Sequence, residues 1–305
     1  KFIPLTTGRL QRIFTRYTIP SLFKIPWGLA QSFWILLTEK PAVVVSFGGY
    51  VGLPVVISAW LLSIPILIHE QTLVPGLANT ISSWFADKIA VSFPRNTVSA
   101  KVVFTGNPLR EEIFHLKVPN QLKRFFISAK KAHKRVLLVT GGNQGAHFIN
   151  QVVEQGLDQL LKDYYIIHQT GDSGFQDYER LSSEKKPGYL VTKFISDGMG
   201  YCMQSADVVV SGAGINSLVE LAYYQTPMVV IPLPVVSNNE QVVNARYFAQ
   251  LGLAEVIEQV QLTPQTLCTA LQTTLNTKSD PKKLTSIVVP DAAARISLEI
   301  ILLAN

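Results

Sequence analysis

Short runs of β-branched and aliphatic residues recur along the chain, separated by segments whose apolar positions follow helical spacing. The first half contains four predicted strands, at 43–46, 64–69, 88–91 and 102–105. The second half contains six, at 135–140, 164–169, 189–192, 208–211, 228–231 and 254–257. Strands that alternate with helices are typical of βαβ units. Two such arrays predict an α/β protein with two Rossmann-like domains and a cleft between them.

The two arrays are separated by a charged stretch that carries no strand pattern. We therefore expect an N-terminal domain over residues 1–115, a linker over 116–134 and a C-terminal domain over 135–290. The final helix, within 291–305, is expected to pack back on the N-terminal domain.

Residues 42–68 form an uncharged stretch of 27 residues, which is long enough for a transmembrane helix. Glycine and proline interrupt it at Gly48, Gly49, Gly52, Pro54 and Pro65. These residues divide the stretch into a strand, a glycine turn, a short helix and a second strand. We interpret it as a buried core, because parallel strands covered by helices on both faces are apolar throughout.

The composition indicates a folded protein, with 48% hydrophobic and 16% charged residues among 305. Cys202 and Cys268 form neither a metal-ligand spacing nor a disulfide framework, which favours a reducing compartment. The five histidines show no zinc-ligand spacing, so we expect no metal site. The chain opens with Lys1 rather than Met, and we expect an N-terminal piece of the protein to precede it.

Positive charge is concentrated in two places, residues 1–40 and residues 116–135, and the second has seven Lys or Arg and no acid. Such patches predict an anionic partner. No nucleic-acid-binding motif is present, so we expect no nucleic acid. Residues 19–37 combine Trp27 and Trp34 with aliphatic residues, a pattern typical of helices at a membrane surface. A core helix with solvated basic flanks has the same pattern, and both readings stay open.

The most informative stretch runs from 208 to 246, where a strand ends in Ser-Gly-Ala-Gly at 211–214 and a helix begins. This arrangement predicts an anion-binding helix N-terminus. Glu220 follows in the second turn of the helix, and a polar cluster at 237–241 follows the next strand. Ligands of open α/β sheets bind outside the carboxyl ends of the strands. The sequence therefore predicts a site for a phosphorylated, hydroxyl-rich ligand such as a nucleotide sugar.

Three further polar turns follow predicted strands. The glycine-rich turn at 141–146 lets backbone approach a ligand, and Arg110 suits a pyrophosphate. His69 and Glu70 end another strand, and either could act as a general base. Each of these turns is also compatible with an ordinary βα loop.

Six segments together resemble, in order and spacing, the motifs of the MurG family, and the resemblance covers nearly the whole chain. They are SFGGYVGLP (46–54), HEQTLVPGLAN (69–79), FTGNPLR (104–110), VTGGNQGAHFIN (139–150), SGAGINSLVELA (211–222) and SNNEQVVNAR (237–246). The resemblance implies a GT-B glycosyltransferase without metal or other cofactor. Such an enzyme transfers N-acetylglucosamine from UDP-N-acetylglucosamine to lipid-linked muramyl-pentapeptide with inversion, at the cytoplasmic face of the bacterial membrane.

The resemblance also implies roles for individual residues on the donor side. Glu220 corresponds to a ribose-binding glutamate, and Glu240 with Gln241 to a pair that recognises the sugar. Asn143 and Arg110 are expected near the pyrophosphate. A group at the start of one helix is expected against the nucleotide and its phosphates: Gly214, Ile215, Asn216 and Ser217.

On the acceptor side, the resemblance implies an N-terminal domain that holds the acceptor diphosphate and docks on an anionic membrane surface. Thr72 replaces the asparagine of the family's HEQN motif. Asn143, Gly212 and Glu240 likewise replace the family's Ser, Arg and Gln or His. The family's first strand and its histidine-containing glycine loop have no counterpart here, so we expect transfer to be affected more than donor binding.

Two alternatives remain open. One is a GT-B transferase that uses another lipid acceptor, and the other is a non-catalytic nucleotide-sugar-binding protein.

Overall fold

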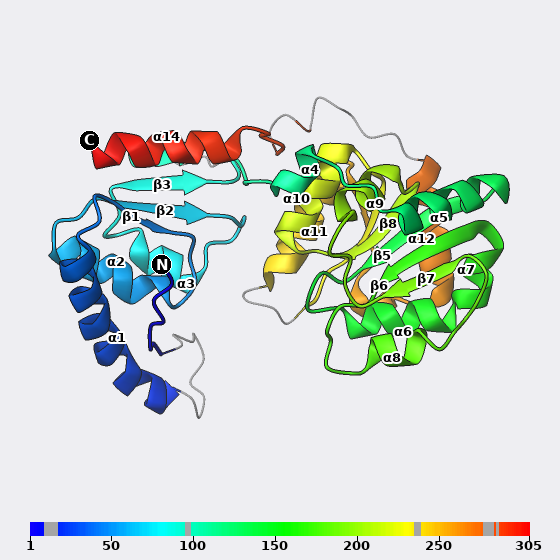
Figure 1. Ribbon diagram of the computed structural model, residues 1–305, viewed down its shortest axis with the longest axis horizontal. Helices are drawn as coiled ribbons and strands as arrows, with labels where there is room; N and C mark the ends of the chain where they lie inside the picture. Colours follow the sequence, from blue (N-terminus) through cyan, green and yellow to red (C-terminus); the bar gives the residue numbers. More distant parts are fainter. Residues whose placement is uncertain (9–17, 95–98, 235–238, 277–283, 285–286) are drawn as a thin grey trace. The chain divides into compact units, whose positions relative to one another are not determined.

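The computed structural model describes residues 1–8, 18–94, 99–234, 239–276, 284 and 287–305 (Figure 1). The chain forms two compact units. Unit 1 comprises Lys1–Pro108 together with Val289–Asn305, and unit 2 comprises Leu109–Val288. The chain therefore passes from one unit to the other twice.

Unit 1 is built on a four-stranded parallel sheet in the order β1-β2-β3-β4. Its strands are β1 (Val44–Ser46), β2 (Ile66–Glu70), β3 (Lys88–Val91) and β4 (Val102–Phe104). Its helices are α1 (Thr18–Glu39), α2 (Gly52–Leu61), α3 (Leu77–Ser82) and α14 (Ala292–Ala304). Figure 1 shows α2 and α3 on one face of the sheet and α14 on the other.

The two faces of β2 explain why its sequence is apolar throughout. Ile66 and Ile68 pack into a cluster on the face covered by α1 and α2. Leu67, between them, packs on the other face with Ile296 of α14. The prediction that residues 42–68 form strand, turn, helix and strand is thus confirmed by β1, α2 and β2. Over the ranges that the structure describes, no helix combines the length and apolar character needed to cross a membrane.

Unit 2 is built on a six-stranded parallel sheet in the order β10-β9-β8-β5-β6-β7. Its strands are β5 (Arg135–Thr140), β6 (Tyr164–Gln169), β7 (Tyr189–Thr192), β8 (Val208–Gly212), β9 (Met228–Ile231) and β10 (Ala254–Val256). The strand order reverses between β5 and β8, which makes their carboxyl ends the topological switch point of the sheet.

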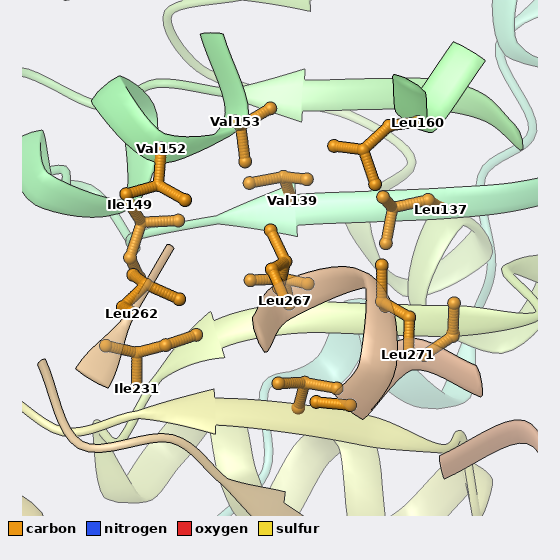
Figure 2. Packing of buried hydrophobic residues seen from close by; sticks show 14 of the residues in the cluster. Leu137, Val139, Ile149, Val152, Val153, Leu160, Ile231, Leu262, Leu267 and Leu271 are labelled. Carbon is orange, nitrogen blue, oxygen red and sulfur yellow. The ribbon is translucent and has the colours of Figure 1, made fainter. Parts of the chain in front are cut away.

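Helices cover the sheet of unit 2 on both faces (Figure 1). They are α4 (Glu111–Phe114), α5 (Asn120–Lys131), α6 (His147–Gln155), α7 (Leu157–Asp163), α8 (Asp177–Leu181), α9 (Met199–Ser205), α10 (Ile215–Tyr224), α11 (Glu240–Gln250) and α12 (Pro264–Asn276), with a 3-10 turn at Gln259–Gln261. In Figure 2, Leu267 and Leu271 of α12 lie against Leu137 and Val139 of β5. This apolar packing fixes the strands whose ends form the switch point.

All ten predicted strands are present, and their ends differ from the predicted ones by at most two residues. The domain limits differ more. Residues 116–134, which we expected to be a linker, contain α5 and belong to unit 2. Unit 2 begins at Leu109, and residues from Val289 onward belong to unit 1.

Candidate functional site

Two helix-opening turns meet at the switch point of unit 2. Thr140 at the end of β5 lies beside Ser211 in β8, so the turn at 141–146 and the turn at 212–214 leave adjacent strand ends. The first turn leads into α6 and the second into α10. The switch point therefore has the geometry that favours an anionic ligand near α10, whose first N–H groups have no partner within the helix.

The residues expected at the start of α10 have different environments. Gly214 has extended backbone before the helix, and a Cβ there would lie more than 4 Å from every residue other than its chain neighbours. Ile215 is buried in the core, so only its backbone could contact a ligand. Asn216 is exposed and Ser217 is half-buried. This turn thus presents backbone, rather than large side chains, to the space outside the strand ends.

Glu220 is buried one turn further along α10, with 5% of its side chain exposed, and it is paired with Arg110. Arg110 donates from Nε to Oε1 and from Nη2 to Oε2 of Glu220, at 2.7 Å each. Its Nη1 lies 2.6 Å from Oε1 of Glu112. The hydrogen bonds to Glu220 raise the pKa of Arg110 above its usual value. The structure thus joins two predicted donor-site residues that lie 110 positions apart in the sequence.

Gln241 connects the turn after β8 to the loop after β9. Its Oε1 accepts hydrogen bonds from the backbone N–H of Ala213 (3.3 Å) and of Leu233 (3.1 Å). Because both partners are donors, the oxygen of the amide must face them, and Nε2 is left to donate elsewhere. Asn244 adds a bond from Nδ2 to the carbonyl of Ala213 (3.2 Å). Gln241 therefore fixes the backbone beside α10 as well as offering a donor group.

The remaining predicted donor-side residues lie at the edge of this site. Glu240 is in the first turn of α11, where a negative side chain is favourable. Asn143 is exposed in the turn after β5, and its carbonyl accepts from the N–H of Asp172 at 3.0 Å. Ser237 and Asn238, from the predicted polar cluster, lie outside the described residues.

A network centred on Asp177 supports the glycine-rich turn, and the sequence did not reveal it. Asp177 accepts hydrogen bonds from Ser173 Oγ (2.6 Å), Asn150 Nδ2 (2.8 Å), His147 Nδ1 (2.7 Å) and Arg180 Nη2 (2.9 Å). Burial alone raises the pKa of Asp177, but these bonds outweigh burial and lower it to about 2. The carboxylate therefore ties the turn after β5 to the loop after β6. The signal for this network in the sequence is the pair of His147 and Asn150, which lie one helical turn apart on α6.

The same network extends into the core through His168. Its Nε2 lies 2.9 Å from Oδ1 of Asn150, and its Nδ1 lies 2.9 Å from the hydroxyl of Tyr189. Nδ2 of Asn150 already donates to the carbonyl of Thr170, so Oδ1 is the acceptor and Nε2 of His168 carries the proton. Burial lowers the pKa of His168 to about 3, which keeps the ring neutral.

In unit 1, the predicted candidate bases are buried at the end of β2. His69 is fully buried, with Nε2 3.3 Å from both the carbonyl of Gly106 and Ser92 Oγ. Burial lowers the pKa of His69. Glu70 accepts from Thr72 N (3.1 Å), Thr72 Oγ1 (2.9 Å) and Asn79 Nδ2 (2.9 Å). Through these bonds His69, Glu70 and Thr72 shape the turn after β2. A catalytic role for His69 or Glu70 stays a prediction.

A cavity of about 180 Å³ lies elsewhere in unit 2, at the amino ends of β9 and β10. Its lining includes Thr226, Met228 and Ala254. Because ligands of such sheets bind at the carboxyl ends, we do not assign the donor to this cavity. Among the described residues, no cluster of three His, Cys, Asp or Glu side chains could hold a metal ion.

Comparison with protein families identifies the class. Residues 136–296 match the glycosyltransferase family 28 C-terminal domain, and residues 1–91 match the family 28 N-terminal domain. The first match alone covers more than half of the chain. The chain therefore belongs to glycosyltransferase family 28.

Individual relatives narrow this class. The chain is 35% identical over 276 residues to a Clostridium kluyveri protein named UDP-N-acetylglucosamine–N-acetylmuramyl-(pentapeptide) pyrophosphoryl-undecaprenol N-acetylglucosamine transferase. The match covers 89% of this chain and 76% of that one. A Staphylococcus aureus protein of the same name is 36% identical over 271 residues, covering 88% and 74%. The predicted membership of the MurG family is thus confirmed.

Solved structures agree with this assignment. The crystal structure of MurG from Acinetobacter baumannii matches with a TM-score of 0.68 and 26% identity, covering 95% of this chain and 82% of that one. A UDP-GlcNAc 2-epimerase from Methanocaldococcus jannaschii matches with a TM-score of 0.62 and 15% identity, over 90% and 79% of the chains. The second likeness concerns the fold alone. The predicted GT-B class is confirmed.

Proposed function

We propose that this glycosyltransferase moves N-acetylglucosamine from UDP-N-acetylglucosamine to lipid-linked muramyl-pentapeptide, with inversion at the anomeric carbon. The observation that carries the proposal is the 35% identity, over 89% of the chain, to a transferase whose name states these substrates. The arrangement of Arg110, Glu220 and Gln241 at the switch point of unit 2 supports it independently.

In the proposed donor complex, Glu220 accepts hydrogen bonds from the two ribose hydroxyls. Arg110 occupies both carboxylate oxygens in the structure, so the nucleotide must displace it. The guanidinium is half-exposed, and its side chain is long enough to turn toward the diphosphate. The donor thereby replaces one bidentate ion pair with two new contacts, ribose to Glu220 and phosphate to Arg110. This exchange avoids leaving a buried carboxylate unpaired.

The departing UDP gains negative charge as the sugar leaves. The first N–H groups of α10 and the guanidinium of Arg110 would stabilise this charge, which is strongest in the transition state. Nε2 of Gln241 would donate to a sugar hydroxyl, because its Oε1 is already bonded to backbone. Glu240, at the start of α11, would complete the sugar contacts, and Asn143 would lie beside the diphosphate.

Unit 1 would bind the acceptor and an anionic membrane surface, on the cytoplasmic side. The outward face of α1 carries Trp27 and Trp34, which are 66% and 69% exposed, and also Leu37. Lys24 and Lys40, at either end of this face, are exposed as well. An apolar, tryptophan-bearing face flanked by lysine suits the headgroup boundary of a bilayer. The opposite side of α1 packs into the core of unit 1 through Leu36, so the alternative reading of α1 as a core helix applies to that side.

A transfer assay tests the proposal. The chain is incubated with UDP-N-acetylglucosamine and lipid-linked muramyl-pentapeptide, and lipid-linked disaccharide is measured. We expect product with the wild type and a strong loss with Glu220→Gln. Product formed only on a different lipid would support a transferase with another acceptor. Donor binding without product on any lipid, both by this chain and by a form extended at its N-terminus, would support a non-catalytic nucleotide-sugar-binding protein.

A further inference from the structure

One face of helix α5 packs against the rest of unit 2. Leu122 and Ala129 are buried against the rest of unit 2. Phe125 packs edge-on against Tyr165, with ring centroids 5.4 Å apart, and Phe126 packs similarly against Tyr201 at 5.1 Å. These contacts fix which side of α5 points away from the unit.

The outward side presents four cations around an aliphatic residue. Ile127 is 46% exposed, and the exposed side chains at offsets −4, −3, +3 and +4 from it are Lys123, Arg124, Lys130 and Lys131. Residues three and four positions apart are neighbours on a helix surface, so these four charges surround Ile127. We call these five residues the α5 basic face.

The charges of the α5 basic face are not neutralised within the chain as far as it is described. None of the ion pairs between described residues includes any of these four side chains. The sequence carries no Asp or Glu between Glu112 and Glu154. Like charges this close repel one another, and the isoleucine among them leaves 46% of its surface exposed. Both features suit an anionic partner that also has an apolar layer.

We propose that the α5 basic face is a membrane contact of unit 2 that binds anionic phospholipid headgroups. Lysine and arginine would bind the lipid phosphates, while Ile127 enters the boundary between headgroups and acyl chains. A single-stranded nucleic acid would also satisfy the cations, but binding sites for single strands commonly add aromatic side chains on which the bases stack. The two phenylalanines of α5 face inward, against Tyr165 and Tyr201, and cannot provide them. A lipid surface therefore accounts for all five residues.

This inference rests on the membrane partner of the proposed function, but it concerns a different unit from α1 and no residue of the donor site. The test uses the full chain and sedimentation with vesicles of phosphatidylcholine, with or without phosphatidylglycerol. We expect Lys130→Gln/Lys131→Gln to weaken binding to the anionic vesicles on the order of tenfold or more. Ile127→Ser should weaken it severalfold without changing binding to heparin, a soluble polyanion.

A matched control separates a defined face from overall charge. Lys162→Gln/Lys185→Gln makes the same charge change at exposed positions of the same unit and should leave binding nearly unchanged. Circular dichroism and UDP binding verify that each variant is folded. Equal losses in both double variants would overturn the inference.

Other outcomes distinguish this inference from the proposed function. Vesicle binding that falls with Trp34→Ser in α1 but not with the α5 variants would overturn the inference and leave the proposed function intact. No vesicle binding by the wild type would overturn the inference and also remove the membrane partner from the proposed function. If the α5 variants lose binding to short RNA but keep vesicle binding, the face binds nucleic acid and the inference is wrong.

Discussion

At the scale of single residues, the pairing of Arg110 with Glu220 determines how the site can work. The sequence indicated a phosphate contact for one and a ribose contact for the other, each from its own motif. It could not reveal that they satisfy each other, because the partners are 110 positions apart and only the fold brings them together. The structure shows the buried carboxylate paired with the guanidinium, and in the proposed donor complex the ligand replaces that partner.

If the ribose replaces Arg110 at Glu220, the variant Arg110→Ala should change the affinities for UDP and for uridine in different directions. UDP should bind at least tenfold more weakly, because its diphosphate loses a charged hydrogen-bond donor. Uridine, which has no phosphate, should bind as well as to the wild type or better, because Glu220 no longer has a competitor. Calorimetric titration measures both, with Arg295→Ala as a control at an exposed ion pair of unit 1. Equal losses for uridine and UDP would show that no exchange occurs.

His168 predicts a specific dependence of stability on pH. Its pKa is about 3 in the folded chain and 6.5 when unperturbed, so between these values the unfolded chain binds more protons. Its contribution to stability is therefore complete above about pH 6.5 and declines as the pH falls toward 3. Between pH 7 and pH 5 this decline amounts to about 2 kcal/mol in the free energy of unfolding.

The variant His168→Gln removes the titrating group and should lack this loss. Urea unfolding followed by circular dichroism at pH 7 and pH 5 measures the difference between variant and wild type. If both lose the same stability on acidification, His168 is not the group responsible.

At the scale of elements, the strands were predictable because each is a short apolar run between turn residues. Helix α5 was not predicted, although Leu122, Phe125, Phe126 and Ala129 have helical spacing. Its charged residues made the segment resemble a linker, and its apolar side is narrow. The network around Asp177 was also missed, since its partners come from three separate segments and only their packing reveals it.

The glycine-rich turn after β5 contains two glycines with similar backbone and different surroundings. Gly142 and Gly145 have φ of +73° and +74°. A Cβ on Gly145 would overlap the carbonyl of Thr170, whereas one on Gly142 would meet nothing within 4 Å. Gly142→Ala should therefore cost about 1 kcal/mol, from the left-handed backbone alone. Gly145→Ala should cost clearly more, since the turn must also move away from the loop after β6.

Thermal unfolding followed by circular dichroism compares these two variants, each serving as the control of the other. Equal shifts in Tm would mean that the close approach to Thr170 does not constrain the turn.

At the scale of the whole molecule, the chain returns from unit 2 to complete unit 1 with α14. Ile296 is a buried residue of α14, and it packs with Leu67 of β2 and Ala90 of β3. Ile296→Ala should reduce the stability of unit 1 by about 2–4 kcal/mol, because it leaves a cavity in a packed core. Leu298, on the same helix, is 55% exposed, and Leu298→Ala should have a small effect.

Tryptophan fluorescence measures this effect selectively, because all four tryptophans of the chain, at positions 27, 34, 60 and 84, lie in unit 1. UDP binding by unit 2 should not change in Ile296→Ala. An unchanged fluorescence transition would contradict the assignment of α14 to the core of unit 1.

The central claim is that the switch point of unit 2 binds a UDP-sugar through the carboxylate of Glu220. Calorimetric titration with UDP-N-acetylglucosamine of the wild type and Glu220→Gln tests it most directly, with Glu258→Gln as a control at an exposed ion pair of the same unit. Saturable binding that falls about tenfold to a hundredfold in Glu220→Gln and stays unchanged in the control is the predicted result. Affinity in Glu220→Gln within twofold of the wild type would contradict the claim.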